Sequence, residues 1–228
     1  MSAAEILVVC DEVSRTFGTG ASAVVAVHGT SCTVTGGARI AIAGPSGSGK
    51  STLLHLLAGL ERPTRGNVGW PGLPAAVGAR THQIGVVFQS PSLLPALDVE
   101  ENVALPLVIA GIGRADCAQR VTEALELVGV EDLAAKLPEE ISGGQAQRVA
   151  VARVLAQRPR LVLADEPTGQ LDHAAGQRLL DALLGATDHL AAALVVTTHD
   201  RAVAERLETQ WSMHEGRLRT TVPGVVRS

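Results

Sequence analysis

The chain has 228 residues, of which 19 are Lys or Arg and 23 are Asp or Glu, giving a formal net charge of −4. This length suffices for one large domain with its own core, and the slight acidic excess argues against a nucleic-acid-binding surface. Hydrophobic residues make up 46% of the chain, but the most apolar stretch, 103–113, is too short to cross a membrane and carries Pro106. Glu5, Asp11 and Glu12 replace a basic lead-in, so we expect no secretory signal peptide.

The three cysteines, Cys10, Cys32 and Cys117, lack the spacing of a metal site, so we expect small, buried, apolar side chains. The high apolar content has two explanations that composition does not separate. It reflects either a core rich in Ala and Val or a surface that docks on a partner. These features together predict a soluble cytoplasmic protein.

The first 35 residues contain short strand-like runs. We expect strands over 6–10, 23–27 and 32–35, and because no helix lies between them, they predict an antiparallel sheet. Phe17 lies in the first connection, before the glycine-rich residues 18–20. Its ring either is exposed and stacks on a base or is buried in the core.

A glycine-rich turn over 44–52 follows the strand-like run 40–43 and precedes a helix expected over 53–58. This context is what the pattern G-x-x-x-x-G-K-[ST] requires. The glycines permit backbone angles that direct successive N–H groups to one phosphate, and the helix N-terminus adds a positive dipole. Lys50 can reach the terminal phosphates, and the Ser51 hydroxyl can ligate Mg²⁺. The sequence therefore predicts a nucleoside triphosphate site formed by Gly44, Pro45, Ser46, Gly47, Ser48, Gly49, Lys50, Ser51 and Thr52.

A polar residue, Gln89, ends the apolar run 84–88, which predicts a buried strand. Its amide can ligate a cation or orient a water molecule; an ordinary solvated loop residue is the alternative. The preceding residues, 62–80, predict a turn and then an irregular loop rich in Gly, Pro and Ala.

Residues 98–157 have a helical pattern. Asp98 and Glu101 fit a capping box, and 114–128 predicts an amphipathic helix that stops at Gly129.

A Ser-Gly-Gly-Gln sequence precedes a helix expected over 149–156. Its backbone N–H groups and hydroxyl could bind an anion, although Ser-Gly-Gly alone is a common sequence. The residues concerned are Ser142, Gly143, Gly144 and Gln145.

Two acidic residues, Asp165 and Glu166, end the apolar run 161–164. Carboxylates at the end of a buried strand are costly unless they meet a cation. Asp165 therefore fits a Mg²⁺ role through water, and Glu166 fits a base that polarises an attacking water. The alternative is two solvated loop acids.

Further polar residues follow in the last third of the chain. Asp172 precedes a helix expected over 173–184, and His199 lies just after a strand expected over 193–197. The imidazole can donate to a phosphate oxygen or serve as a structural histidine. Residues 210–221 predict a hairpin with a Glu-Gly turn.

In this order, the motifs resemble those of the ATP-binding subunit of an ABC transporter, over nearly the whole chain. The resemblance implies an α/β fold: a P-loop NTPase core with an antiparallel β subdomain and an inserted α-helical subdomain. We expect one ABC ATPase domain over 1–228. Residues 1–88 and 157–228 would form the core and β subdomain, and 89–156 the helical subdomain.

The resemblance also assigns roles to the motif residues. Glu166, His199, Lys50 and Gln89 would be catalytic, with Glu166 activating water and His199 sensing the γ-phosphate. Ser51, Gln89 and Asp165 would surround Mg²⁺. Nucleotide contacts would come from Phe17 at the adenine, from the Walker A residues 44–52, and from Ser142, Gly143, Gly144, Gln145 and Asp172.

In this family the signature residues 142–145 complete the partner's site, which implies a head-to-tail homodimer with two ATP molecules between the subunits. ATP and Mg²⁺ are the implied cofactors, and a membrane permease is the implied partner. We expect no nucleic acid and no membrane span. The subunit would be cytoplasmic, held at the inner face of the cell membrane through the permease.

Within the family, residues 88–95 and 101–107 look like the lipoprotein-releasing, macrolide-exporting and cell-division type, which implies export or extraction. Phe17 stands where Tyr is more usual, Gln170 where Asn or Ala is expected, and Ala146 where a polar residue is usual. None of these departures touches the hydrolytic groups. The alternative is a regulatory ABC ATPase whose permease-like partner controls an extracytoplasmic enzyme without moving cargo.

Overall fold

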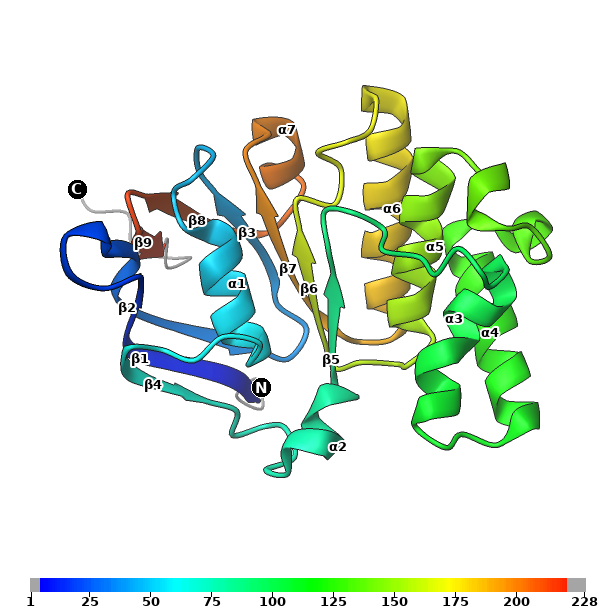
Figure 1. Ribbon diagram of the computed structural model, residues 1–228, viewed down its shortest axis with the longest axis horizontal. Coiled ribbons are helices and arrows are strands. Elements are labelled where there is room, and N and C mark those ends of the chain that lie inside the picture. Colours follow the sequence, from blue (N-terminus) through cyan, green and yellow to red (C-terminus); the bar gives the residue numbers. More distant parts are fainter. Residues whose placement is uncertain (1–4, 221–228) are drawn as a thin grey trace. The chain divides into compact units, whose positions relative to one another are not determined.

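The computed structural model describes residues 5–220 (Figure 1). The chain forms two compact units, Met1–Arg80 with Ala193–Ser228, and Thr81–Ala192. Among the described residues, no helix has both the length and the apolarity that a membrane span requires.

The first unit contains a three-stranded antiparallel sheet of order β2-β1-β4. The predicted antiparallel arrangement is confirmed, but the separate strands predicted over 23–27 and 32–35 are one strand. Strand β2 continues through Gly29, where its pairing with β1 is irregular. A bulge accommodates this residue without ending the strand. The loop predicted over 62–80 is also wrong in part, since β4 and most of α2 lie within it. The bounds are β1 (Ile6–Phe17), η1 (Gly20–Ser22), β2 (Val24–Thr35), β4 (Arg65–Gly69) and α2 (Val77–Thr81).

Two of the cysteines, Cys10 and Cys32, lie directly opposite each other across β1 and β2. They and Cys117 are buried free thiols, as predicted. A hydrogen bond to Cys10, together with burial, raises the pKa of Cys32. The pairing was not visible from the spacing of the cysteines along the chain.

The same unit contains a second set of strands, in which β3 pairs in parallel with β7 and β8, and β8 pairs with β9 in the predicted hairpin. Helix α1 ends where Gly59 adopts the left-handed conformation, as the sequence predicted, but it begins at Lys50, three residues before the predicted start. The bounds are β3 (Arg39–Ala43), α1 (Lys50–Ala58), β7 (Ala193–Thr198), α7 (Arg201–Ala204), β8 (Thr209–His214) and β9 (Arg217–Thr220). Thr221, predicted to end the hairpin, lies outside the described residues.

The second unit combines the parallel pair β5 and β6 with four long helices (Figure 1). Helix α5 lies at its centre, in contact with α3, α4, α6 and β5. The bounds are β5 (Ile84–Val87), α3 (Val99–Ile109), α4 (Arg114–Val128), η2 (Glu131–Leu133), η3 (Pro138–Glu140), α5 (Gly143–Leu155), β6 (Leu161–Asp165) and α6 (His173–His189).

The helix ends test the predicted caps. The Asp98–Glu101 capping box is present, and Gly129 ends α4 in the left-handed conformation, so both predictions are confirmed. Helix α5 begins six residues before the predicted 149, because Ser142 and Gln145 form a second capping box that the sequence reasoning missed. Helix α6 also extends beyond the predicted 184, to His189.

Candidate functional site

The glycine-rich turn lies between β3 and α1. Gly47 and Gly49 have φ of +76° and +98°, the left-handed conformations that their predicted role requires. Gly44 does not; a Cβ there would collide with the backbone oxygen of Met213. The turn therefore needs Gly44 for space, which corrects the expectation that all three glycines supply unusual backbone angles.

The positive charge of the turn is held close to its backbone. Lys50 is buried, and its Nζ donates to the carbonyl oxygens of Gly44 at 2.9 Å and Pro45 at 3.0 Å. The hydroxyl of Ser48 is buried and has no hydrogen-bond partner among residues 5–220. A buried cation and an unpartnered hydroxyl beside a turn of this shape fit a bound phosphate chain.

Two other segments of this unit hold the turn in place. The Gly216 N–H, in the β8–β9 turn, donates to the Ser48 carbonyl at 2.9 Å. The Gly44 N–H donates to the Thr198 carbonyl at 3.2 Å, which places the next residue, His199, close to the start of the turn. His199 was a candidate from its sequence context, but Gly216 was not, because its only signal was a Glu-Gly pair typical of a hairpin.

The aromatic candidate, Phe17, is the last residue of β1 and pairs with Val24, so its predicted place in a loop is wrong. The side chain is 40% exposed, which excludes the core alternative. The Arg15 guanidinium lies over the ring, 4.4 Å from its centroid. The exposed part of the ring can stack on a base.

The remaining candidates belong to the second unit. Gln89 is exposed, two residues after β5 ends. Asp165 is buried at the end of β6, so the alternative of two solvated loop acids is wrong for this residue. Glu166 has φ of +45°, a conformation that costs a non-glycine residue about 1 kcal/mol or more and often marks a functional position.

The signature residues and Asp172 share one cavity of about 330 Å³. Ser142 is the N-cap of α5, and the Asp172 carboxylate caps α6 by accepting from the Ala175 N–H at 2.9 Å. Two helix N-termini therefore open on the same cavity, an arrangement that favours an anion. Arg148 and Arg178 also line it; the sequence reasoning missed both, since neither belongs to a motif.

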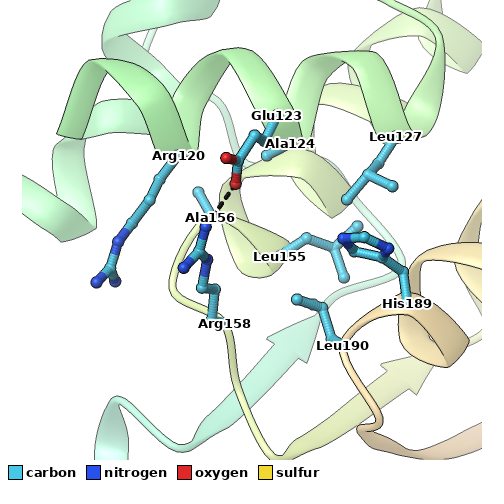
Figure 2. A pocket seen from close by; sticks show the side chains of 9 residues that line it. All are labelled: Arg120, Glu123, Ala124, Leu127, Leu155, Ala156, Arg158, His189 and Leu190. Atoms are coloured by element: carbon cyan, nitrogen blue, oxygen red, sulfur yellow. Dashed lines mark hydrogen bonds and ion pairs between the residues drawn. The ribbon is translucent and has the colours of Figure 1, made fainter. Parts of the chain in front are cut away.

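A second cavity of this unit, of about 370 Å³, contains none of the motif residues. Figure 2 shows the Arg158 guanidinium reaching Glu123 of α4, at 2.6 Å. This hydrogen bond lowers the pKa of Glu123. Arg158 lies three residues after α5 ends, and His189 is the last residue of α6; the Arg158 charge offsets the dipole of α5. The charged residues of this cavity therefore have a structural role in stabilising the helices.

The predicted residues thus fall into two sets. Phe17, 44–52 and His199 belong to the first compact unit, and Gln89, Asp165, Glu166, the signature and Asp172 to the second. A strand–turn–helix with a buried lysine defines a P-loop nucleotide-binding protein.

The chain matches the model of the family described as "ABC transporter" over residues 27–169, and it therefore belongs to that family. It is 42% identical over 221 residues to the lipoprotein-releasing system ATP-binding protein LolD of Legionella pneumophila (strain Lens), covering 94% of this chain and 97% of the relative. The LolD protein of strain Paris is 41% identical over the same length. The chain is thus an ATP-binding ATPase subunit of the ABC type.

Solved structures agree with this assignment. The ATP-binding cassette MJ0796, in a dimeric post-hydrolysis state bound to ADP and Pi, matches with a TM-score of 0.83 and 33% identity, covering 94% of this chain and 98% of that chain. The cassette cbiO1 of Clostridium perfringens, part of the ABC transporter complex cbiONQ, matches with a TM-score of 0.83 and 27% identity, covering 94% and 87%. The predicted P-loop α/β fold is confirmed.

Proposed function

We propose that this ATPase hydrolyses MgATP in two sites shared by a head-to-tail homodimer, and that hydrolysis drives a membrane permease of the export or extraction type. Two surfaces whose backbone donors suit an anion support the shared site: the glycine-rich turn in one compact unit and the signature cavity in the other. One copy would hold the ATP phosphates with the first surface, and its partner would cover them with the second. A related cassette is itself dimeric in its ADP- and Pi-bound state.

Within each site, the residues act by positioning and electrostatics. The backbone of the turn and the Lys50 ammonium hold the phosphates, and the exposed Phe17 ring stacks on adenine. Glu166 follows β6 directly and has a left-handed backbone. Its carboxylate orients the attacking water and accepts its proton. His199 donates to the γ-phosphate and senses it, and Gln89 binds the Mg²⁺ of the same nucleotide, so its position depends on what is bound.

The donors assigned to Mg²⁺ are the Ser51 hydroxyl, the Gln89 amide oxygen and the Asp165 carboxylate, which are oxygen ligands of the kind that Mg²⁺ takes. The buried position of Asp165 also fits, since a desolvated carboxylate is costly away from a cation. Residues 5–220 contain no cluster of three or more His, Cys, Asp or Glu suited to a metal, which fits a cation held largely by substrate phosphates. When bound, Mg²⁺ neutralises charge on those phosphates.

Chelation tests this proposal. In excess EDTA, we expect phosphate release by the purified subunit to fall by about 100-fold or more. A fluorescent ATP analogue should still bind, because Lys50 and the backbone N–H groups of the turn remain. Undiminished hydrolysis in EDTA would contradict the metal assignment, and a subunit inactive in saturating MgATP would contradict the function.

The relatives are named as subunits of a lipoprotein-releasing system, and this favours transport over the regulatory alternative. We therefore place the chain on the cytoplasmic side of the membrane, bound to its permease. Residues 89–156 would form the helical subdomain that receives it.

The permease contact proposed here is the uncharged loop 90–97, which follows Gln89. The backbone of Leu94 is held by hydrogen bonds to Asn102, while its side chain is exposed to solvent. Its N–H donates to Asn102 Oδ1 at 2.8 Å, and its carbonyl accepts from Asn102 Nδ2 at 3.1 Å. The Leu94 side chain is nevertheless 45% exposed. An exposed apolar side chain on a fixed backbone, five residues after Gln89, suits a partner contact.

A charge at Leu94 tests this contact. We expect Leu94→Glu to keep the subunit folded and hydrolysing ATP, while recovery with the co-expressed permease falls roughly tenfold or more, as for loss of a central interface residue. Leu60→Glu is the matched control, because Leu60 is 58% exposed and lies two residues after α1 ends. Undiminished permease recovery with Leu94→Glu would rule out this residue as a contact, and loss of basal hydrolysis would assign it to packing.

A further inference from the structure

The backbone on both sides of Gln89 is held by one helix. On the N-terminal side, the Phe88 carbonyl accepts a hydrogen bond from Gln147 Nε2 of α5 at 2.9 Å. Gln147 is buried, so its amide would be left unsatisfied if this bond were broken. The bond joins residues 59 positions apart in the chain.

On the C-terminal side, the same helix contributes Arg153. Its Nη2 donates to the Pro91 carbonyl at 2.9 Å and its Nη1 to the Ser92 carbonyl at 3.0 Å. Burial lowers the pKa of Arg153, and a charge in such surroundings depends on its hydrogen-bond partners. Ser92 has φ of +51°, a conformation that a non-glycine residue keeps only when its surroundings hold it.

Helix α5 itself has little freedom to absorb a movement of this loop. It contacts three helices and β5, and its packing on β5 is so close that a Cβ on Gly85 would collide with Val154. Farther along the loop, the fully buried Asn102 of α3 binds the backbone of Leu94, Leu97 and Asp98.

The N-terminus of α5 carries the signature residues, with Ser142 as its N-cap. Gln147 and Arg153 lie along this 13-residue helix, which is about 20 Å long. Three hydrogen bonds thus tie the backbone on both sides of Gln89 to this closely packed helix.

We propose that Gln147 and Arg153 are positioning residues that join the Gln89 loop to the signature helix, so that displacement of Gln89 moves the signature with it. The inference rests on the proposed function, in which Gln89 and the signature both contact nucleotide. It adds the physical link: a nucleotide sensed at Gln89 sets the position of the signature through α5.

Arg153→Met removes both donors while keeping the length of the side chain. We expect kcat to fall about tenfold, the effect of losing hydrogen bonds from a charged group. Affinity for a fluorescent ATP analogue should stay within about twofold, because the glycine-rich turn is unchanged. Arg153→Lys, which keeps the charge and one reachable carbonyl, should recover part of kcat. Arg158→Gln is the control, since within residues 5–220 the Arg158 side chain binds Glu123 and no carbonyl of the Gln89 loop.

Hydrogen exchange gives a second readout that needs no variant. On addition of a non-hydrolysable MgATP analogue, the amides of 90–94 and of the first turn of α5 should change protection together in the unmutated subunit. In Arg153→Met, or in Arg153→Lys if the first variant does not fold, 90–94 should exchange faster and its response should separate from that of α5. A response of one segment without the other in the unmutated subunit would overturn the link.

Gln89→Ala, assayed in parallel, separates this inference from the proposed function. If Gln89→Ala lowers kcat while folded Arg153→Met and Gln147→Met do not, the link is refuted and the function stands. If Gln89→Ala hydrolyses ATP at the unmutated rate, the role proposed for Gln89 fails, and the inference fails with it.

Discussion

Replacing Glu166 with Gln should lower ATP hydrolysis by roughly 100- to 10,000-fold, the usual contribution of a general base. Binding should survive, because the amide keeps the shape of the side chain and the glycine-rich turn is untouched. ATP would then persist between two signature cavities and two turns. We expect a stable ATP-bound dimer that the unmutated subunit forms only transiently.

Size-exclusion chromatography with MgATP, with Mg²⁺-free ATP and with MgADP measures this directly. The variant should elute as a dimer with ATP and as a monomer with ADP, since ADP lacks the γ-phosphate that we propose both copies contact. Glu139→Gln is a suitable control, because Glu139 is an exposed glutamate of the same unit. Hydrolysis by Glu166→Gln at near the unmutated rate would show that another group is the base.

The second large effect separates the two anion-binding surfaces. Lys50→Ala should weaken ATP binding by about tenfold or more and stop hydrolysis, because the buried ammonium that we assign to the ATP phosphates is lost. Ser142→Arg should leave binding to the monomer intact and stop hydrolysis, because the bulky side chain blocks the partner's ATP.

Ser142 also caps α5, so its replacement costs about 1 kcal/mol of stability by loss of the cap alone. Ser142→Ala, which loses the cap without adding bulk, measures that contribution by thermal unfolding. Equal loss of ATP binding in Lys50→Ala and Ser142→Arg would place the signature in its own subunit's site.

The parts of the fold that the sequence predicted are those set by local chemistry. Gly59 and Gly129 end helices because the left-handed conformation suits glycine, and Asp98 with Glu101 starts one. The glycine-rich turn carries its own geometry at Gly47 and Gly49. Each of these signals spans only a few residues.

The parts that the sequence could not predict depend on distant partners. Gly44 is required by the backbone of Met213, some 170 positions away along the chain. The bonds from Gln147 and Arg153 to the Gln89 loop join residues that no motif relates. The strained backbone of Glu166 is likewise invisible in its sequence motif, although it bears on the proposed catalytic role.

The shared site is the central claim, and mixing two inactive subunits tests it most directly. In a head-to-tail dimer of Lys50→Ala with Ser142→Arg, one site combines an intact turn with an intact signature, and the other site contains both defects. Because half of randomly formed dimers are mixed and each has one good site of two, an equimolar mixture should recover up to about one quarter of the unmutated phosphate release. A mixture as inactive as either variant alone, with both variants folded, would contradict the shared site.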